Sequence, residues 1–479
     1  MINGQDLIEW GFPQKSGKAF GEALDWAKRL EGGGTKIEDI RECIMSSVPK
    51  PKIEMRLTPN WWEEAIRPET SYDVENIKKV RVCMDQLMRC PVIKRGAIMP
   101  DACPAGSQYG TIPVGGAIEV DNAIIPASHS ADVCCSMRAT FFQDTRTPTQ
   151  IIDNLKRNTH FGQGGRRKSG FIHHPIVSQL DENNEFLRGL GDIALAHMGT
   201  QGDGNHFAYL GEMEVTPEFL GDLIDAGYEG DAFIFEHYVN EKLYVLVTHH
   251  GSRNLGAHIY RRGLDAAQKL TAQIANNIPK TCAWIPYRSR QGHDYWDALQ
   301  YVREWTKANH EVIHGRTVGN RAIHTYFNEH NFVWKREDSF FHGKGATPAW
   351  DKKIGLIPLN MASPILLTVG RDNDKFLSFS PHGAGRNVSR TETLAPYKQK
   401  DGEYDEKAIE KEVAKQTKGI DVRWYTGRMD LSETPLGYKS AAQIKEQIVE
   451  FGLAKIIAEI QPLGCIMAGH IVQPWREKR

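Results

Sequence analysis

Apolar and polar residues follow one another in blocks that predict helices in some regions and strands in others. Apolar positions recur at helical spacing over 21–30 and 72–88, which predicts two amphipathic helices near the N-terminus. The run Glu31-Gly32-Gly33-Gly34 would end the first of them. Over about 90–143 the pattern changes to short β-branched runs between glycines and prolines, which predicts strands joined by tight loops.

The second half of the chain repeats this change between helical and extended patterns. The apolar run 243–247 predicts a buried strand, and 340–395 predicts further strands and loops. Ser440 and Gln443 have the spacing of a capping box at the start of a last helix. The later helices are predicted over 177–197, 256–275, 295–327 and from 440 to about 459. Because helices and strands are grouped in blocks, the predicted fold class is α+β.

The chain shows neither an internal repeat nor a proline- or serine-rich linker. Its candidate site residues are spread over 132–382, so a single domain that brings them together fits better than a string of modules. We therefore expect a mostly helical N-terminal segment, 1–95, followed by one large catalytic domain over 96–479 with mixed sheets and surrounding helices.

Composition agrees with a globular protein of cytoplasmic type. The 479 residues are 40% hydrophobic and 25% charged, and no apolar run is long enough to span a bilayer. The first residues lack the pattern of a secretion signal, so we expect a cytoplasmic protein without a membrane partner. The net charge of −1 argues against a general polyanion binder but allows a local basic groove. Gly164–Gly170, which contains two arginines and a lysine, is a candidate groove or else a solvated charged loop.

The eight cysteines do not suggest a disulfide framework in such a chain. Six of them are expected to be small buried or harmless surface residues, namely Cys43, Cys83, Cys90, Cys103, Cys282 and Cys465. Cys135 differs because it follows Asp132 by three residues at the end of a strand-like run. A carboxylate and a thiolate at this spacing can face one cation, and a thiolate can bridge two. The alternative is a turn aspartate beside a core cysteine.

Three histidines have surroundings that would suit a metal site. His206 follows a glycine-rich loop, His249 leaves the predicted strand before Gly251-Ser252-Arg253, and His330 follows a predicted helix. His250 competes with His249, but neighbouring strand residues face opposite ways, so only one of the two can point into a site. For His206 and His330 the alternative is a hydrogen-bonded or solvated histidine. An imidazole, thiolate and carboxylate set suits zinc and also manganese, cobalt or iron.

The segment His382-Gly383-Ala384-Gly385-Arg386 has the strongest chemical pattern. A histidine beside small residues is open to an incoming phosphorus atom, and a neutral imidazole is a competent nucleophile. Arg386 and Arg390 could stabilise charge on phosphate oxygens, and Lys344 lies in a cationic glycine-containing loop. The pattern favours phosphoryl or nucleotidyl transfer, with a purely structural glycine turn as the alternative.

In this order and at these spacings the motifs resemble those of the RtcB family of GTP- and manganese-dependent RNA ligases. The similarity runs from about Ile98 to the C-terminus, about four-fifths of the chain. The most specific motifs are Gly204-Asn205-His206-Phe207, His249-x-Gly251-Ser252-Arg253, Lys344-Gly345-Ala346-Thr347 and His382-Gly383-Ala384-Gly385-Arg386.

The resemblance implies a role for each matching residue. Two Mn²⁺ ions would be held by Asp132, Cys135, His206, His249 and His330. Cys135 would bridge the two ions, and His382 would become covalently guanylylated. Nucleotide or RNA phosphate would be contacted by Asn205, Arg253, Lys344, Asn360, Ser363, Arg386 and Arg390. Tyr438 matches a family position near the guanine.

The resemblance also implies the substrates. GTP would guanylylate His382, and the GMP would pass to an RNA 3′-phosphate, which could first be released from a 2′,3′-cyclic phosphate. A 5′-hydroxyl RNA end would then displace GMP. The sequence does not indicate an activating protein partner. Two other functions remain open, a dinuclear phosphodiesterase or phosphatase and an inactive RNA-binding paralogue.

Several positions depart from the family pattern. Cys134 and Ser136 stand where the family usually has glycines, and His250 replaces a serine. Tyr209 stands in place of a glutamate that recognises guanine, and Met467 in place of a lysine near the nucleotide. The segment 358–363 also differs from the family's motif. We interpret the chain as a divergent paralogue with altered base recognition, and we hypothesise a role in RNA repair.

Overall fold

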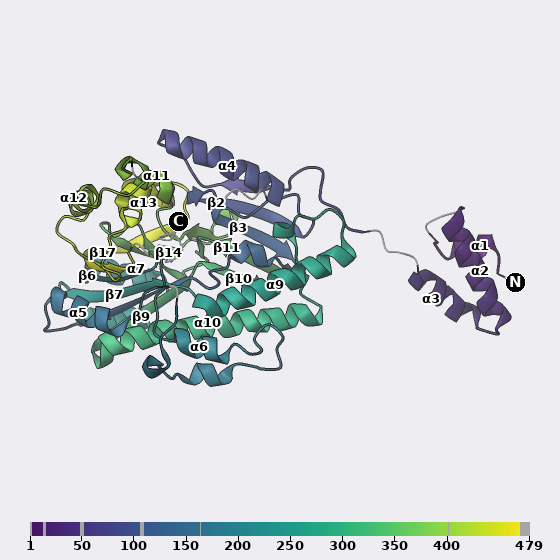
Figure 1. Ribbon diagram of the computed structural model, residues 1–479, viewed down its shortest axis with the longest axis horizontal. Coiled ribbons are helices and arrows are strands. Elements are labelled where there is room, and N and C mark those ends of the chain that lie inside the picture. Colours follow the sequence, from purple (N-terminus) through teal and green to yellow (C-terminus); the bar gives the residue numbers. More distant parts are fainter. Residues whose placement is uncertain are drawn as a thin grey trace. The chain divides into compact units, whose positions relative to one another are not determined.

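The computed structural model describes residues 2–12, 16–47, 52–105, 110–162, 164–400 and 402–469 (Figure 1). The chain divides into two compact units. The first comprises Met1–Ile53 with Ile274–Asn276, and the second comprises Glu54–Gln273 with Asn277–Arg479. No helix within the described ranges has both the length and the apolar character of a membrane span.

The described residues of the first unit form three helices, α1 (Gly4–Glu9), α2 (Lys18–Gly32) and α3 (Ile37–Ser47). The predicted helix over 21–30 lies inside α2, which ends at the glycine run. The apolar faces of the helices form a small core of their own. Its buried residues are Ile2, Leu7, Phe12, Ala23, Ala27, Ile40 and Ile44.

The second predicted helix, over 72–88, is α4 (Ser71–Leu87), and it belongs to the second unit. Thr70 and Asp73 form the capping box at its start. Its buried face packs on β2 (Ile93–Cys103). The compact units therefore divide near Ile53, whereas the functional division expected at 95/96 stays a prediction.

Within the described part of the second unit, the strands form two larger sheets and two short ladders. The smaller of the large sheets has the order β1-β2-β3-β11-β10, and the larger runs β13-β14-β17-β6-β7-β5-β9 with β16 paired to β17. The short ladders are β12-β15 and β4-β8. Besides β2, the first large sheet contains β1 (Trp62–Glu64), β3 (Val114–Asp121), β10 (Asn331–Arg336) and β11 (Ser339–Lys344). The second contains β5 (Ser136–Phe142), β6 (Phe207–Glu214), β7 (Lys242–His250), β9 (Ala322–Glu329), β13 (Ile354–Pro358), β14 (Ile365–Gly370), β16 (Asp421–Trp424) and β17 (Ala454–Met467). The ladder strands are β4 (Ala123–Ile124), β8 (Ile285–Pro286), β12 (Ala346–Pro348) and β15 (Phe379–Pro381).

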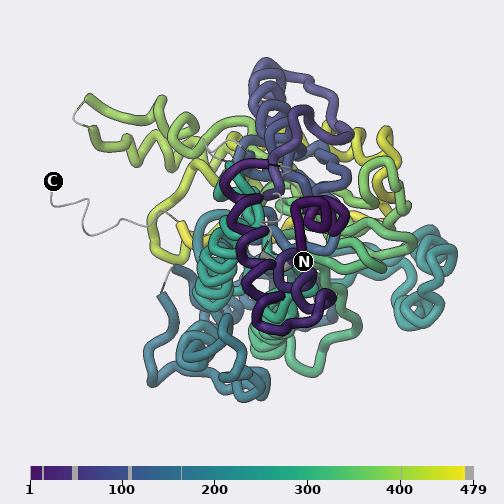
Figure 2. Tube along the Cα trace, turned by 90° about the vertical axis from the view of Figure 1, so that its right-hand side faces the viewer, coloured from purple at the N-terminus to yellow at the C-terminus, as the bar shows by residue number. Residues whose placement is uncertain are grey.

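Helices surround these sheets, which confirms the predicted α+β class. Their bounds are α5 (Pro148–Asn158), α6 (Gly191–His197), α7 (Pro217–Asp225), α8 (Glu229–Glu236), α9 (Arg253–Ile274), α10 (Arg290–Thr317), α11 (Arg390–Leu394), α12 (Glu406–Gln416) and α13 (Ala441–Glu450). The light-green segment in Figure 2 contains α11 and α12. Both helices contact the short 3₁₀ helix Leu431–Glu433.

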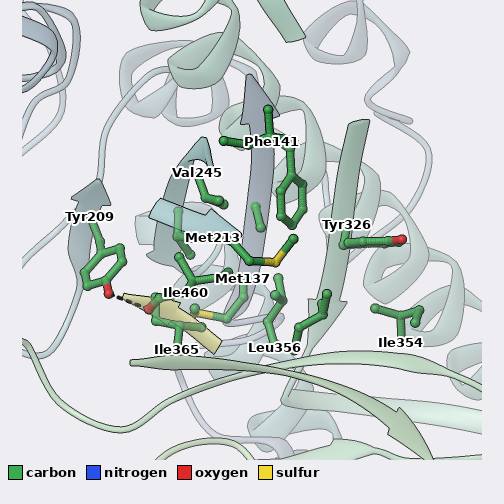
Figure 3. Close-up of a cluster of buried hydrophobic side chains, with 14 of the residues drawn as sticks. Met137, Phe141, Tyr209, Met213, Val245, Tyr326, Ile354, Leu356, Ile365 and Ile460 are labelled. Carbon is green, nitrogen blue, oxygen red and sulfur yellow. Dashed lines mark hydrogen bonds between the residues drawn. The ribbon is translucent and has the colours of Figure 1, made fainter. Parts of the chain in front are cut away.

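The main core of the second unit lies on one face of the larger sheet (Figure 3). Phe141 of β5 is fully buried and makes edge-to-face contacts with Phe235 and Tyr326. Tyr209 of β6 is also buried, and its hydroxyl donates to the carbonyl of Ile460 over 2.9 Å. The apolar residues that alternate along β5, β6 and β7 thus pack this face of the sheet into the core.

Two predicted helices were too long. The helix expected over 295–327 ends at Thr317, and 322–329 form β9 instead. Gly319, at a φ of +61°, turns the chain between them. His330 therefore lies between two strands and not after a helix. The helix expected over 177–197 exists only as α6 and a 3₁₀ turn at Pro175–Gln179.

The last predicted helix was wrong beyond Glu450. Gly452, at a φ of +61°, follows the end of α13, and the β-branched residues after it enter β17, which pairs with both β14 and β6. The predicted capping box is also wrong, because in the described chain the Ser440 side chain makes no cap bond. Gln443 instead donates to Asp73.

Candidate active site

Four neighbouring strands bring the candidate metal ligands to one edge of the larger sheet. β5 begins directly after Cys135, and β6 begins directly after His206. β7 ends at His249-His250, and β9 ends one residue before His330. The strands lie in the order β6-β7-β5-β9 and are antiparallel, so the starts of two meet the ends of the other two.

The five side chains predicted as ligands meet at this edge. The Cys135 Sγ lies 3.4 Å from His206 Nε2 and 3.2 Å from His249 Nε2. Asp132 Oδ2 lies 3.0 Å from His206 Nε2, and the Nε2 atoms of His249 and His330 are 3.1 Å apart. Two groups suited to a metal ion result, one of Asp132, Cys135 and His206 and one of Cys135, His249 and His330. Cys135 is common to both groups.

The electrostatics of this cluster favour cation binding. Burial lowers the pKa of His249 to about 3 and holds that of His330 well below its usual value, so both rings are neutral. Burial and the Asp132 carboxylate raise the pKa of the Cys135 thiol. Burial opposes ionisation of Asp132 as well, but His206 holds the pKa of this carboxyl below its usual value. A thiolate beside a carboxylate needs a nearby cation, and this donor set suits a divalent transition metal.

His249 and His250 face opposite sides of β7. His249 Nδ1 is 3.2 Å from the carbonyl of Asn205, which fixes its ring beside Cys135. His250 instead stacks on His310 of α10 at a centroid distance of 3.5 Å. Only His249 can therefore take part in the cluster.

His382 lies next to this cluster and is held by a buried carboxylate. Its ring centroid is 4.9 Å from that of His330. Asp101 Oδ2 accepts hydrogen bonds from His382 Nδ1 over 2.6 Å and from the His382 backbone N–H over 3.2 Å. Because a carboxylate only accepts, this hydrogen bond places a proton on Nδ1, and in the neutral ring Nε2 then keeps its lone pair. Asp101 is not among the site residues predicted from the sequence, where a carboxylate within an apolar strand gives it no more specific signal.

A cavity of about 340 Å³ opens beside His382 and the metal-ligand cluster. It is lined by most of the predicted site residues. These are Asp132, Cys135, Asn205, His249, His330, Lys344, Asn360, His382, Arg386, Arg390 and Tyr438. The nucleophile candidate, the metal-ligand candidates and the cationic side chains thus share one pocket.

Glu433 organises the cationic side of the cavity. Arg390 Nε donates to Glu433 Oε1 over 2.7 Å, and the Tyr438 hydroxyl donates to Oε2 over 2.6 Å. Arg386 Nη1 lies 3.7 Å from the same carboxylate, and its guanidinium lies 5.1 Å from the Tyr438 ring centroid. Glu433 is not among the site residues predicted from the sequence, because it occupies a short 3₁₀ turn without a recognisable motif.

Three predicted residues do not line the cavity. His206 instead lies within hydrogen-bonding distance of Asp132 and Cys135. Arg253 donates to the Gly162 carbonyl and the Thr200 hydroxyl, and the Ser363 backbone N–H donates to Asn360 in a turn.

In the candidate basic groove at 164–170, the Arg166 side chain turns inward. It donates to the carbonyls of Met198 and Gly199. Arg167 and Lys168 are exposed.

The fold and the site together define an α+β protein with a buried cluster of residues that could hold metal ions, beside a histidine held by a carboxylate. The family model described as tRNA-splicing ligase RtcB matches residues 178–468, which is more than half of the chain. The chain belongs to the RtcB family. Asp101, Asp132 and Cys135 precede the matched range, so their assignment depends on the geometry above.

Individual relatives are distant but similar over most of their length. The tRNA-splicing ligase RtcB of Nanoarchaeum equitans is 26% identical over 450 residues, covering 78% of this chain and 88% of that protein. The tRNA-splicing ligase RtcB of Thermococcus kodakarensis is 23% identical, covering 78% and 87%. The RNA-splicing ligase RtcB of Escherichia coli K12 is 25% identical, covering 63% and 76%.

Proposed function

We propose that this protein is an RNA ligase that joins a 3′-phosphate or 2′,3′-cyclic phosphate RNA end to a 5′-hydroxyl end through a histidine–GMP intermediate. The observation that carries the proposal is the Asp101–His382 hydrogen bond beside the metal-ligand cluster. It leaves the nucleophilic nitrogen of His382 free next to a site for cations. Membership in the RtcB family supports the same chemistry.

Two Mn²⁺ ions would be held by the two residue groups that share Cys135. When bound, they would neutralise phosphate charge and orient the phosphorus atom that is attacked. The donor set fits this role, because a thiolate can bridge two cations. The Asp132 carboxylate and the His206 imidazole complete one group, and the neutral imidazoles of His249 and His330 complete the other.

The first step would be attack of His382 Nε2 on the α-phosphorus of GTP. The N–P bond forms while the bond from the α-phosphorus to the bridging oxygen breaks, and pyrophosphate leaves. Asp101 keeps the proton on Nδ1 and stabilises the positive charge that develops on the ring. Lys344, Arg386 and Arg390 line the cavity where they would contact phosphate oxygens, and Asn205 and Asn360 add polar groups.

The next two steps would transfer GMP to RNA and join the ends. An oxygen of the RNA 3′-phosphate attacks the phosphorus of the adduct, and His382 leaves as a neutral imidazole. The 5′-hydroxyl of the second RNA end then attacks the activated 3′-phosphate, forming the phosphodiester and releasing GMP. We further propose RNA repair as the cellular role and the cytoplasm as the location.

Incubation of the purified protein with Mn²⁺ and α-labelled GTP tests the proposal. We expect label that survives denaturation and is acid-labile, as a phosphoramidate is, and ligation of 3′-phosphate to 5′-hydroxyl RNA. Phosphate release without nucleotide and without an adduct would instead indicate a phosphodiesterase or phosphatase. Absence of both activities with several metals would indicate a non-catalytic RNA-binding protein.

Tyr209 offers a test of how the base is recognised. Its buried ring lines the cavity, as do Cys465 and Met467, and Tyr209 of β6 pairs with Cys465 of β17. Its hydroxyl already donates a hydrogen bond to the Ile460 carbonyl. A carboxylate in this place could accept hydrogen bonds from the N–H groups of guanine, which adenine lacks at that edge. We therefore expect Tyr209→Glu to raise the preference of adduct formation for GTP over ATP by about tenfold or more. Equal GTP/ATP ratios in the variant and the wild type would show that position 209 does not contact the base.

A further inference from the structure

A buried ammonium group lies directly behind the Asp101–His382 pair. The Lys439 Nζ donates to the carbonyls of Pro100 over 2.9 Å and Ala102 over 3.0 Å. These two carbonyls flank Asp101 in the chain. The ammonium also lies 3.7 Å from Asp73 Oδ1, and both side chains are fully buried. Burying a lysine is costly unless it is paired and hydrogen-bonded, and here both conditions are met.

The backbone carbonyls on either side of Asp101 accept hydrogen bonds from a side chain outside the sheet. Ile98 of β2 pairs with Gly116 of β3, and the next pair is Cys103 with Val114. The ladder is therefore interrupted over 99–102, where several residues of β2 face a single residue of β3. Lys439 hydrogen-bonds two carbonyls within this interruption, the part of β2 that carries Asp101.

Lys439 also joins this strand to the loop that carries His382. Its backbone N–H donates to the Gly385 carbonyl over 3.0 Å. Gly385, at a φ of +70°, lies so close to Asp101 that a Cβ there would be 2.1 Å from the Asp101 carbonyl oxygen. On the other side, a Cβ on Gly115 would be 2.8 Å from Asp101 Oδ1. Asp101 is thus packed closely against Gly115 and Gly385, and Lys439 hydrogen-bonds the carbonyls of the residues on either side of it.

We propose that Lys439 is a positioning residue for nucleotidyl transfer, which fixes Asp101 and thereby the tautomer and direction of the His382 ring. The inference rests on the proposed function, in which His382 Nε2 must be aligned with the α-phosphorus. Misplacement of a reacting group by about 1 Å costs on the order of 10²-fold in rate. Lys439 itself is not among the residues that line the cavity, so it would act through Asp101 and not on the substrate directly.

The buried charges around Asp101 support this role. With both carboxylates ionised and the lysine protonated, Asp73, Asp101 and Lys439 together carry one net negative charge, and the proposed first step starts from a neutral His382 ring. When the N–P bond forms, the His382 ring keeps its Nδ1 proton and becomes positive. The set is then neutral overall, so Lys439 balances part of the carboxylate charge before the reaction without cancelling the charge that stabilises the product.

The experiment compares Lys439→Met with Gln443→Met. Gln443 is buried in the same cluster and donates to Asp73 and to the Arg67 carbonyl, but to no group next to Asp101. Both variants replace a buried polar side chain by methionine, so general loss of stability affects both. The first readout is the proton resonance of His382 Nδ1–H in protein loaded with diamagnetic Zn²⁺, assigned by its absence from His382→Ala. The second is the rate constant and half-saturating GTP concentration of adduct formation with Mn²⁺.

In Lys439→Met we expect the downfield Nδ1–H resonance to shift upfield or vanish. The rate constant of adduct formation at saturating GTP should fall on the order of 10²-fold. The half-saturating GTP concentration and the bound metal should stay near their wild-type values, and Gln443→Met should match the wild type in all four quantities. A wild-type rate and resonance in folded Lys439→Met would overturn the proposal, as would an equal loss in Gln443→Met.

The remaining outcomes are also decisive. If Lys439→Met does not unfold cooperatively, Lys439→Gln takes its place, and failure of both to fold would assign the lysine to general stability and overturn the proposal. If the wild type forms no adduct, the proposed function fails, while the resonance comparison still decides whether Lys439 positions His382. Absence of the resonance from the wild type would remove the hydrogen bond on which the inference depends and would overturn it.

Discussion

Replacing His382 by alanine is expected to abolish covalent labelling by α-labelled GTP. The variant lacks the only group that can form the N–P bond in the proposed first step, so the rate of adduct formation should fall by on the order of 10⁴-fold or more. The metal-ligand cluster does not include His382, so metal bound per protein should be unchanged. Labelling is measured after denaturation, and metal by elemental analysis of the same sample.

His237→Ala is the matched control, because His237 is exposed at the end of α8 and away from the cavity lining. It should label like the wild type. Asp101→Asn forms an intermediate case, because an amide can donate to Nδ1 and move the ring proton to Nε2. We expect a loss on the order of 10²- to 10⁴-fold there. Full labelling of His382→Ala would show that another residue carries the nucleotide.

The sequence predicted that Asp132, Cys135, His206, His249 and His330 would lie close together, and the fold brings them together because four of them stand at the ends of neighbouring strands. Cys135, His206, His249 and His330 adjoin β5, β6, β7 and β9, and antiparallel pairing of these strands is enough to bring them together. Alternation of side chains along a strand implied that only one of His249 and His250 could enter the site, and the family resemblance selected His249. In the fold, His250 stacks on His310 on the other face. Their roles as ligands remain proposals, but their proximity is a property of the fold.

The partners of these residues could not be predicted in the same way. Asp101 is 281 residues from His382 in the chain, and an isolated carboxylate in an apolar strand does not indicate which group it accepts from. Glu433 acquires meaning only when Arg386, Arg390 and Tyr438 gather around it. Such contacts depend on tertiary packing, which local patterns do not encode.

The errors in secondary structure have a similar cause. Residues 318–327 continue the apolar spacing of α10, yet Gly319 ends the helix and the sheet edge beside β5 accepts the segment as β9. The segment after Gly452 is likewise drawn into β17, because it fills the place between β14 and β6. In both cases strand pairing overrides a helical pattern that is only locally favourable.

Cys135 should be the single most important metal ligand, because it is the one side chain common to both ligand groups. We expect Cys135→Ala to lose most of the bound metal and to reduce adduct formation by on the order of 10³-fold or more. Cys134→Gly is the control. Cys134 has a φ of +57°, which glycine adopts without strain, and its thiol belongs to neither group, so this variant should keep both metal and activity. Metal per protein from elemental analysis and labelling with α-labelled GTP decide the matter. Loss of metal in Cys134→Gly with retention in Cys135→Ala would show that Cys135 is not the bridging ligand. It would also remove the basis for a two-metal site.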